Sequence, residues 1–312
     1  MGVIKTFDGD FKIHRKIFEK TNEYNNVLPL VFLFIKSMSK TIRHIAMMLD
    51  TRPKTLYQVF DNIDNYYYEK RQPKTKYGEP QKDKKSIRYR DLLPSMYPLK
   101  GMQQKLNFLL QRLELPLYAY GSVKESNNIL NAREHIGNKY FFSVDLKNFF
   151  SNITHHQVFK MFLKNKFSPA ASSVLTKLTT YRGGLPQGAP TSPIISNLVF
   201  VETGKKLMEA IKNYQITFTS YLDDLTFSCK SDFKQLTYKL LKILKEDKFY
   251  LNHKKVYYKT YMPEVTGLVI HQNKLQPILS MKKRAEENRH VANYLKSINS
   301  YKDALEILRD LH

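Results

Sequence analysis

The stretch Ile216–Cys229 reads "ITFTSYLDDLTFSC", two short runs of apolar, aromatic and β-branched residues on either side of an aspartate pair. Runs of this kind favour strands, and the polar pair between them predicts a β-hairpin with a tight turn at Asp223 and Asp224. Aspartate is common in turns, so an isolated pair would have an ordinary structural explanation. Whether these carboxylates do more depends on the rest of the chain.

The composition points to a polyanionic partner. The chain has 312 residues and a formal net charge of +23, with 51 Lys and Arg against 28 Asp and Glu. Such an excess repels itself unless phosphates neutralise it, and its spread over the whole length predicts extended contact with nucleic acid. A membrane-surface protein is the alternative, but neither end carries a strongly basic amphipathic helix.

The hydrophobic content of 42% predicts a folded protein. Cys229 is the only cysteine, which excludes an intrachain disulfide and makes a cysteine-based zinc site implausible. The longest apolar run, Val27–Ile35, is too short to span a bilayer and lies too far from the start for a secretory signal. We therefore expect a cytoplasmic protein without a membrane association.

Apolar spacing of three and four residues predicts helices in the first third of the chain. They cover "LPLVFLFIKSMS", "SKTIRHIAMMLDTRPKTLYQVFDNI" and "PLKGMQQKLNFLLQRL". The second stretch has the outline of a helix-turn-helix, which we interpret as a pair of packing helices. The basic, aromatic segment Tyr66–Arg90 suits either a hairpin that reaches toward nucleic acid or a triphosphate, or a solvated loop.

The middle of the chain alternates strands and helices. Asn138–Leu146 predicts a strand, and Thr154 with Gln157 forms the pattern of a capping box that begins a helix. "EVTGLVIHQNKLQPI" predicts a second hairpin that turns at residues 272–273, and one basic helix follows from Ser280. Together these elements predict an α+β fold, with an antiparallel sheet and helices on one face.

A third carboxylate, Asp145, lies near the end of the strand "YFFSVDL". A buried carboxylate needs a partner or a metal ion. If this strand neighbours the hairpin, Asp145, Asp223 and Asp224 converge, and their repulsion calls for divalent cations. Hard oxygen ligands suit Mg²⁺, and two such ions would promote in-line phosphoryl transfer.

The stretch "GGLPQGAPTSPIISNLVF" (183–200) begins as a loop rich in glycine and proline and ends as a helix. Gly188 lets the backbone approach a ligand closely, and Gln187 offers both a donor and an acceptor to a nucleotide. Alone, the stretch would be only a rigid loop before a helix.

In combination these motifs resemble a known family. "FSVDLKNFF", "LPQGAPTSP" and "YLDD", in this order, resemble the A, B and C motifs of reverse transcriptases, and "LNHKKV" resembles the next motif, with Lys255 as its lysine. "NAREH" (131–135) and "VTG" (265–267) resemble two signatures of bacterial retron reverse transcriptases. The resemblance runs from about residue 84 onward. The chain departs from it where Leu222 replaces the usual alanine and Ser122 an aromatic residue.

The resemblance implies a right-hand polymerase with fingers over 1–139, a palm over 140–272 and a short helical thumb over 273–312. It implies Asp145, Asp223 and Asp224 as catalytic metal ligands for two Mg²⁺ ions, with Mn²⁺ as a possible substitute. The nucleotide pocket it implies consists of Arg90, Phe150, Gln187, Gly188 and Lys255. An aromatic ring at Phe150 would clash with a ribose 2′-OH and so favour dNTPs.

The resemblance also implies a function with a specific RNA. The chain would copy part of a cognate structured noncoding RNA into DNA, primed from an RNA 2′-OH to give a branched product, and would act in anti-phage defence with an effector protein. The residues expected to contact RNA lie in the two signatures and the thumb: Asn131, His135, Val265, Thr266, Gly267, Lys282, Lys283 and Arg284.

Three alternatives remain open from the sequence. An RNA-binding scaffold that restrains a toxin would have little use for three repelling carboxylates. A helix-turn-helix regulator leaves the palm motifs unexplained. A group II intron-like reverse transcriptase would carry an extension after the thumb for which we expect no room.

Overall fold

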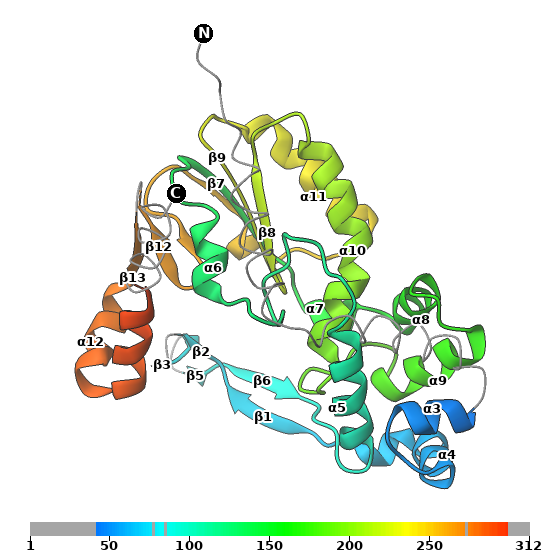
Figure 1. The fold of residues 1–312 in the computed structure, drawn as a ribbon. Coiled ribbons are helices and arrows are strands. Elements are labelled where there is room, and N and C mark those ends of the chain that lie inside the picture. The colour runs from blue at the N-terminus through cyan, green and yellow to red at the C-terminus, as the bar shows by residue number, and fades with distance from the viewer. Residues whose placement is uncertain (1–41, 77–78, 84–85, 272–273, 299–312) are drawn as a thin grey trace, which may run out of the picture.

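The computed structural model describes residues 42–76, 79–83, 86–271 and 274–298 (Figure 1). The helix predicted over "LPLVFLFIKSMS" and the turn predicted at residues 272–273 lie outside these ranges. Within them, no helix is both long and apolar enough to cross a membrane.

The centre of the fold is a four-stranded antiparallel sheet in the order β10-β7-β9-β8. Its strands are β7 (Tyr140–Asp145), β8 (Thr217–Tyr221), β9 (Asp224–Cys229) and β10 (Tyr257–Lys259). The strand predicted around Asp145 and the hairpin predicted around the aspartate pair are confirmed. The turn itself is Leu222 and Asp223, with Leu222 at a φ of 57°, while Asp224 already belongs to β9.

One face of this sheet is apolar and carries two helices. Phe218 and Phe227 stack with ring centroids 4.5 Å apart, and Phe142 lies 5.9 Å from Phe227. These rings share one core with the buried sides of α10 (Ser192–Ile211) and α11 (Thr237–Glu246), which lie beside the sheet in Figure 1. Burial of each phenylalanine contributes on the order of 2 kcal/mol.

The other face is more polar, and a short helix covers part of it. Ser228 and Thr219 point to this side and meet the segment that follows α6 (Asn128–Arg133). The prediction of helices on one face therefore fits α10 and α11 but is wrong for α6. The alternation of apolar and hydroxyl residues along β9 is the physical reason, because each face offers a different surface for packing.

Three predicted elements of the body are confirmed. Thr154 and Gln157 form the capping box, and α8 (His155–Lys164) begins there. The predicted amphipathic helix is α5 (Leu99–Leu110). The suspected helix-turn-helix is a packing pair, α3 (Ile42–Met48) and α4 (Pro53–Asp61).

The remaining helices of the body are short. They are α7 (Phe149–Asn152), α9 (Pro169–Thr179) and the 3-10 turns η2 (Ile63–Tyr66), η3 (Lys234–Leu236) and η4 (His253–Lys255). In Figure 1, α8 and α9 lie between the sheet and the α3–α4 pair.

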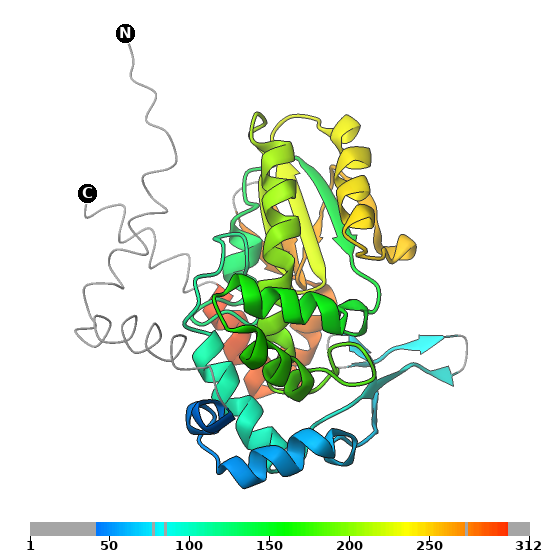
Figure 2. The same cartoon turned by 90° about the vertical axis from the view of Figure 1, so that its right-hand side faces the viewer.

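The basic segment after residue 66 forms a branched ribbon rather than a loop. Its stem pairs β1 (Lys70–Pro73) with β6 (Tyr89–Leu92). Two small hairpins extend the stem: β2 (Thr75–Lys76) with β3 (Glu79–Pro80), and β4 (Lys82–Asp83) with β5 (Ser86–Ile87). The ribbon projects from the body (Figure 2).

A second sheet lies beside α6. It consists of β11 (Glu264–Val265), β12 (Leu268–Ile270) and β13 (Leu275–Pro277), all antiparallel. The pairing of β12 with β13 confirms the predicted hairpin, and β11 adds a strand through a turn at residues 266–267. This sheet has its own small core, which includes Ile129 of α6 and Phe141 of β7.

The single basic helix predicted over residues 280–298 is wrong. The chain forms α12 (Leu279–Glu287), breaks at Asn288, and continues as a second helix over the described residues 289–298. The Asn288 side chain accepts hydrogen bonds from the backbone N–H of His290 and Val291, so it caps the new helix. Arg289 is therefore not on the same helix as Lys282 and Lys283.

Candidate active site

Strand register brings the predicted carboxylates together. Asp145, the last residue of β7, is the direct antiparallel partner of Asp224, the first residue of β9. The backbone N–H of Leu146 donates to the carbonyl of Asp223 at 2.8 Å, which fixes the turn against the end of β7. Asp145 is buried, Asp223 half-buried and Asp224 exposed. The site thus opens to solvent at one end of the sheet.

Both oxygens of Asp145 have partners on the segment around η4. Asn252 Nδ2 donates to Oδ1 at 2.8 Å, and Lys255 Nζ lies 2.5 Å from Oδ2. The backbone N–H of Asn252 also donates to the carbonyl of Asp145 at 2.9 Å. The predicted lysine therefore reaches the site through Asp145. The sequence analysis missed Asn252, although it stands inside the quoted "LNHKKV" motif.

The pKa values of Asp223 and Asp224 are raised. Loss of hydration, followed by the charges of Asp223 and Asp145, raises the pKa of Asp224 to about 7 against the opposing charge of Lys255. Burial likewise raises the pKa of Asp223, with Asp145 adding to the shift and Lys255 and Arg90 opposing it. Asp224 is exposed, so solvent screens part of this repulsion.

Burial lowers the pKa of the Lys255 ammonium, but the hydrogen bond to Asp145 and the three carboxylate charges outweigh that effect and raise it overall. Lys255 therefore stays protonated at neutral pH. It offsets part of the negative charge that the three aspartates concentrate.

The chemistry of this donor set fits a hard divalent cation. Oxygen ligands of like charge that repel one another are stabilised by Mg²⁺ or Mn²⁺. As the side chains stand, no group of three or more His, Cys, Asp or Glu residues in the described part of the chain is arranged to hold a metal ion. At this site both oxygens of Asp145 are engaged by Lys255 and Asn252.

The predicted nucleotide loop lies against the base of the ribbon. The carbonyl of Gln187 accepts from the backbone N–H of Leu93 at 2.7 Å. Gly188 has a φ of 111°, and a Cβ there would lie 3.6 Å from the Cβ of Leu92. Arg90 is exposed on β6, and its charge acts on Asp223. The loop thus contacts the ribbon, and the ribbon brings a positive charge within reach of the carboxylates.

Two adjacent phenylalanines take different positions. Phe149 is 4% exposed and packs against Phe200 and Phe249. Phe150, whose ring centroid lies 5.7 Å from that of Phe149, is only half-buried. The core position therefore belongs to Phe149, and Phe150 keeps exposed ring surface on the side of α7.

A glycine outside the predicted motifs also shapes the site. The segment 118–121 runs parallel to β8, where the Tyr120 N–H donates to the carbonyl of Ser220 at 2.8 Å. A Cβ on Gly121 would lie 2.7 Å from the backbone nitrogen of Leu222, closer than real contacts allow. Only glycine lets this segment touch the turn that carries the aspartates.

Three residues predicted to contact RNA are interior residues instead. Asn131 is 1% exposed, His135 0% and Val265 1%. His135 has both ring nitrogens engaged, Nδ1 2.7 Å from Ser228 Oγ and Nε2 2.8 Å from Thr219 Oγ1. Burial lowers its pKa to about 3, so the ring is neutral. The prediction of direct RNA contact is wrong for Asn131 and Val265, because they fill the space between α6 and the sheets. For His135, which the sequence predicts either to hold structure or to touch RNA, burial favours the structural role.

The two signatures form one hydrogen-bonded unit. Asn131 Nδ2 donates to Thr266 Oγ1 at 3.3 Å, and Thr266 Oγ1 donates to the carbonyl of Asn128 at 3.1 Å. Asn128 Nδ2 in turn donates to the hydroxyl of Tyr294 at 2.6 Å, which ties in the helix over 289–298. Thr266 and Gly267 remain half-exposed at the turn, with φ values of 46° and 87°.

The predicted basic residues of the thumb are only partly described. Lys282 and Lys283 are exposed on α12, where they can reach a phosphate backbone. The side chain of Arg284 lies outside the described part of the chain.

Comparison with known proteins agrees with this geometry. The family model for reverse transcriptase (RNA-dependent DNA polymerase) matches residues 80–287, which is more than half of the chain. The chain belongs to this family. The matched range includes the ribbon end that holds Arg90, all three aspartates and α12.

The curated relatives of this reverse transcriptase confirm the resemblance to retron enzymes. It is 32% identical over 193 residues to the retron Ec86 reverse transcriptase of Escherichia coli, covering 60% of each chain. It is 29% identical over 191 residues to the retron Se72 enzyme of Salmonella heidelberg, covering 60% of this chain and 48% of the relative. The retron Ec83 enzyme of Escherichia coli is 28% identical over 237 residues, with 70% and 75% covered. The match thus spans less than two thirds of the first two relatives' lengths.

Among solved structures, telomerase from Candida albicans in complex with a TWJ fragment of telomeric RNA aligns with a TM-score of 0.46 at 11% identity. The alignment covers 72% of this chain and 50% of that one. At this level of similarity we draw no functional argument from it.

His135→Ala should destabilise the fold by about 3 kcal/mol, because it opens a cavity and removes the ring that bonds to the hydroxyls of Thr219 and Ser228, leaving Ser228 with Asn138 alone. Urea denaturation measures the loss, and the exposed His156→Ala serves as the matched control with little change. If the His135→Ala protein were as stable as the parent but bound RNA less tightly, the result would support a direct contact between His135 and RNA.

Glu134 provides a pH-dependent prediction. Burial raises its pKa from 4.5 to about 7, although the Tyr120 hydroxyl donates a hydrogen bond to it. Because the folded-state pKa lies above the unfolded value, ionisation of Glu134 destabilises the fold progressively from about pH 4.5 to pH 7 and fully above that. Glu134→Gln should therefore melt at a higher temperature than the parent at pH 8, with the two converging near pH 4.5. A constant difference at both pH values would contradict this reading.

Proposed function

We propose that this chain is an RNA-directed DNA polymerase that copies part of a cognate structured noncoding RNA. The observation that supports it most is the register of β7 and β9, which pairs Asp145 with Asp224 and places Asp223 in the adjoining turn. A structural or purely RNA-binding protein has no need to gather three aspartates at the open end of a sheet, where the charge of Asp145 raises the pKa of both Asp223 and Asp224. Membership of the reverse transcriptase family supports the same activity.

Divalent metal ions held by Asp145, Asp223 and Asp224 would supply the activation of the attacking hydroxyl and the stabilisation of the pyrophosphate that leaves. The chain's own residues bind and orient the nucleotide. Arg90 brings a guanidinium from the ribbon to the side where its charge already acts on Asp223. Lys255, protonated at neutral pH, is the group able to give a proton to the pyrophosphate once it is released from Asp145.

Selection of the nucleotide would depend on sterics and on one amide. The exposed part of the Phe150 ring, which follows Asp145 by five residues in the chain, would exclude a 2′-OH. Gln187 is half-buried and Gly188 is exposed. The loop that contains them can therefore present its backbone and the Gln187 side chain to a base or sugar.

The RNA partner is inferred from charge and from the shape of the thumb side. Thr266 and Gly267 at an exposed turn, with Lys282 and Lys283 on α12, would contact a stem-loop and direct its priming hydroxyl toward Asp145. Priming from a 2′-OH, a branched RNA–DNA product and a role in anti-phage defence with an effector protein extend this proposal through the retron relatives.

The double variant Asp223→Asn, Asp224→Asn should reduce dNTP incorporation by at least 10³-fold, because both substitutions remove charged metal ligands. Primer extension on an annealed RNA template, followed on a sequencing gel, measures the loss. RNA binding by the variant should remain, and the exposed Asp61→Asn is the matched control with normal extension. Full extension by the double variant would leave the chain as an RNA-binding scaffold and overturn the proposal.

Phe150→Ala should raise rNTP incorporation relative to dNTP by about tenfold or more, since only a steric barrier is removed. Competition between labelled dNTP and rNTP in single-nucleotide extension gives the ratio. Phe149→Leu is the matched control, because it should lower the melting temperature without changing that ratio. An unchanged ratio in Phe150→Ala would show that discrimination lies elsewhere.

A further inference from the structure

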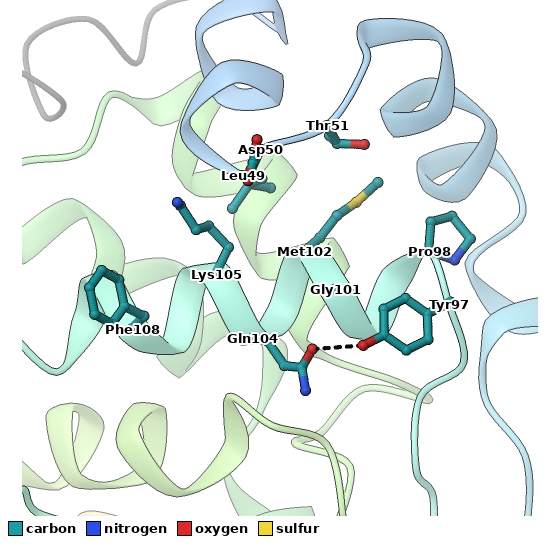
Figure 3. A pocket seen from close by; sticks show the side chains of 10 residues that line it. All are labelled: Leu49, Asp50, Thr51, Tyr97, Pro98, Gly101, Met102, Gln104, Lys105 and Phe108. Carbon is teal, nitrogen blue, oxygen red and sulfur yellow. Dashed lines mark hydrogen bonds between the residues drawn. The ribbon is translucent and has the colours of Figure 1, made fainter.

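The outer side of α5 carries a groove that the polymerase site does not use. A cavity of about 560 Å³ lies between α5 and the α3–α4 turn, with Asp50 and Thr51 on one side and Gln104, Lys105 and Phe108 on the other (Figure 3). Its volume falls in the range of roughly 300–1,000 Å³ that is typical of ligand sites. It shares no lining residue with the carboxylate site.

Exposed aromatic rings border this groove at both ends of the helix. Tyr97 is 67% exposed and Phe108 53% exposed. The Tyr97 hydroxyl donates to Gln104 Oε1 at 3.1 Å, and the ring lies over Gly101, where a Cβ would come within 3.2 Å of it. The ring is thus held in place although most of its surface faces solvent.

A cation accompanies each of these rings. The Arg112 guanidinium lies 4.3 Å from the centroid of Phe108, and Lys100 Nζ lies 5.8 Å from that of Tyr97. A ring has two faces, so a cation on one leaves the other for a second planar group. The combination of an exposed ring with a neighbouring cation is typical of surfaces on which unpaired bases stack.

The charge around the groove also favours an anion. The α5 sequence "LKGMQQKLNFLL" contains no acidic residue, and Asp50 is the only acidic residue among those that line the cavity. Lys105 lines the cavity, while Lys100 and Arg112 lie over the flanking rings of Tyr97 and Phe108. For a hydrophobic helix of a partner protein, these cations and Gln104 would interrupt the apolar contacts. A nucleic-acid strand would use both the rings, by base stacking, and the cations, by phosphate contact.

We propose that this groove, bounded by Tyr97 and Phe108, binds an unpaired segment of RNA by base stacking, with phosphates on Lys100, Lys105 and Arg112. A duplex would keep its bases inside the stack, so it could use only the cations. The site therefore distinguishes single-stranded from double-stranded RNA. The proposal goes beyond polymerisation and does not require it.

The test compares the affinity of the full chain for a labelled 20-nucleotide single-stranded RNA and for the same RNA annealed to its complement. Tyr97→Ala with Phe108→Ala should weaken single-strand binding by at least fivefold, since base–aromatic stacking is lost, and should change duplex binding less than twofold. Tyr97→Phe with Phe108→Trp should retain single-strand binding. Tyr238→Ala on α11, at a ring 77% exposed, is the matched control and should behave as the parent.

Two further readouts separate this proposal from its alternatives. Both rings are exposed, so the melting temperature of the double alanine variant should match the parent. The double alanine variant should extend an annealed primer–template normally. This readout distinguishes failure of the groove proposal from failure of the polymerase proposal. Unchanged single-strand affinity, or an equal loss on single-stranded and duplex RNA, would overturn the proposal and leave the groove to a protein partner or to general phosphate contact.

Discussion

The antiparallel register between β7 and β9 is the constraint on which both the core and the site depend. It sets Asp145 opposite Asp224 and, three residues along, Phe142 opposite Phe227. Side chains alternate across a strand, so a slip of one residue would move every one of them to the other face. The same slip would turn the phenylalanines away from α10 and α11 and separate the aspartates. Apolar burial thus fixes the position of charged groups that would otherwise repel one another.

That repulsion is tolerated because other parts of the chain oppose it. Lys255 and Asn252 occupy both oxygens of Asp145, and Arg90 acts on Asp223 from a different element. Burial of the aromatic face stabilises the sheet, since each buried ring contributes on the order of 2 kcal/mol. Solvent also screens the charge of the exposed Asp224 and so weakens the repulsion. Apolar burial therefore stabilises the sheet enough to offset the repulsion among the three carboxylates.

Local patterns predicted the elements, and long-range contacts decided what the patterns could not. The hairpin at Ile216–Cys229 and the capping box at Thr154 follow from residues a few positions apart, so the sequence sufficed for them. Two contacts join segments about 100 residues apart: that of Gly121 with the aspartate turn and that of Asn252 with Asp145. Sequence periodicity does not predict either of them. The break at Asn288 was readable in principle, because Asn is a preferred helix cap.

The burial of His135 changes how the retron signatures are understood. His135 bonds to Ser228 on β9 and Thr219 on β8, the two strands that hold the aspartate turn. Asn131 and Thr266 join the preceding helix, α6, to the β11–β12 turn, and Asn128 joins α6 to Tyr294. The signatures therefore connect the back of the catalytic hairpin to the exposed turn and the helix over 289–298. Contacts that RNA makes at that turn would reach the aspartates through packed side chains and hydrogen bonds, so the signatures can govern synthesis without reading a base.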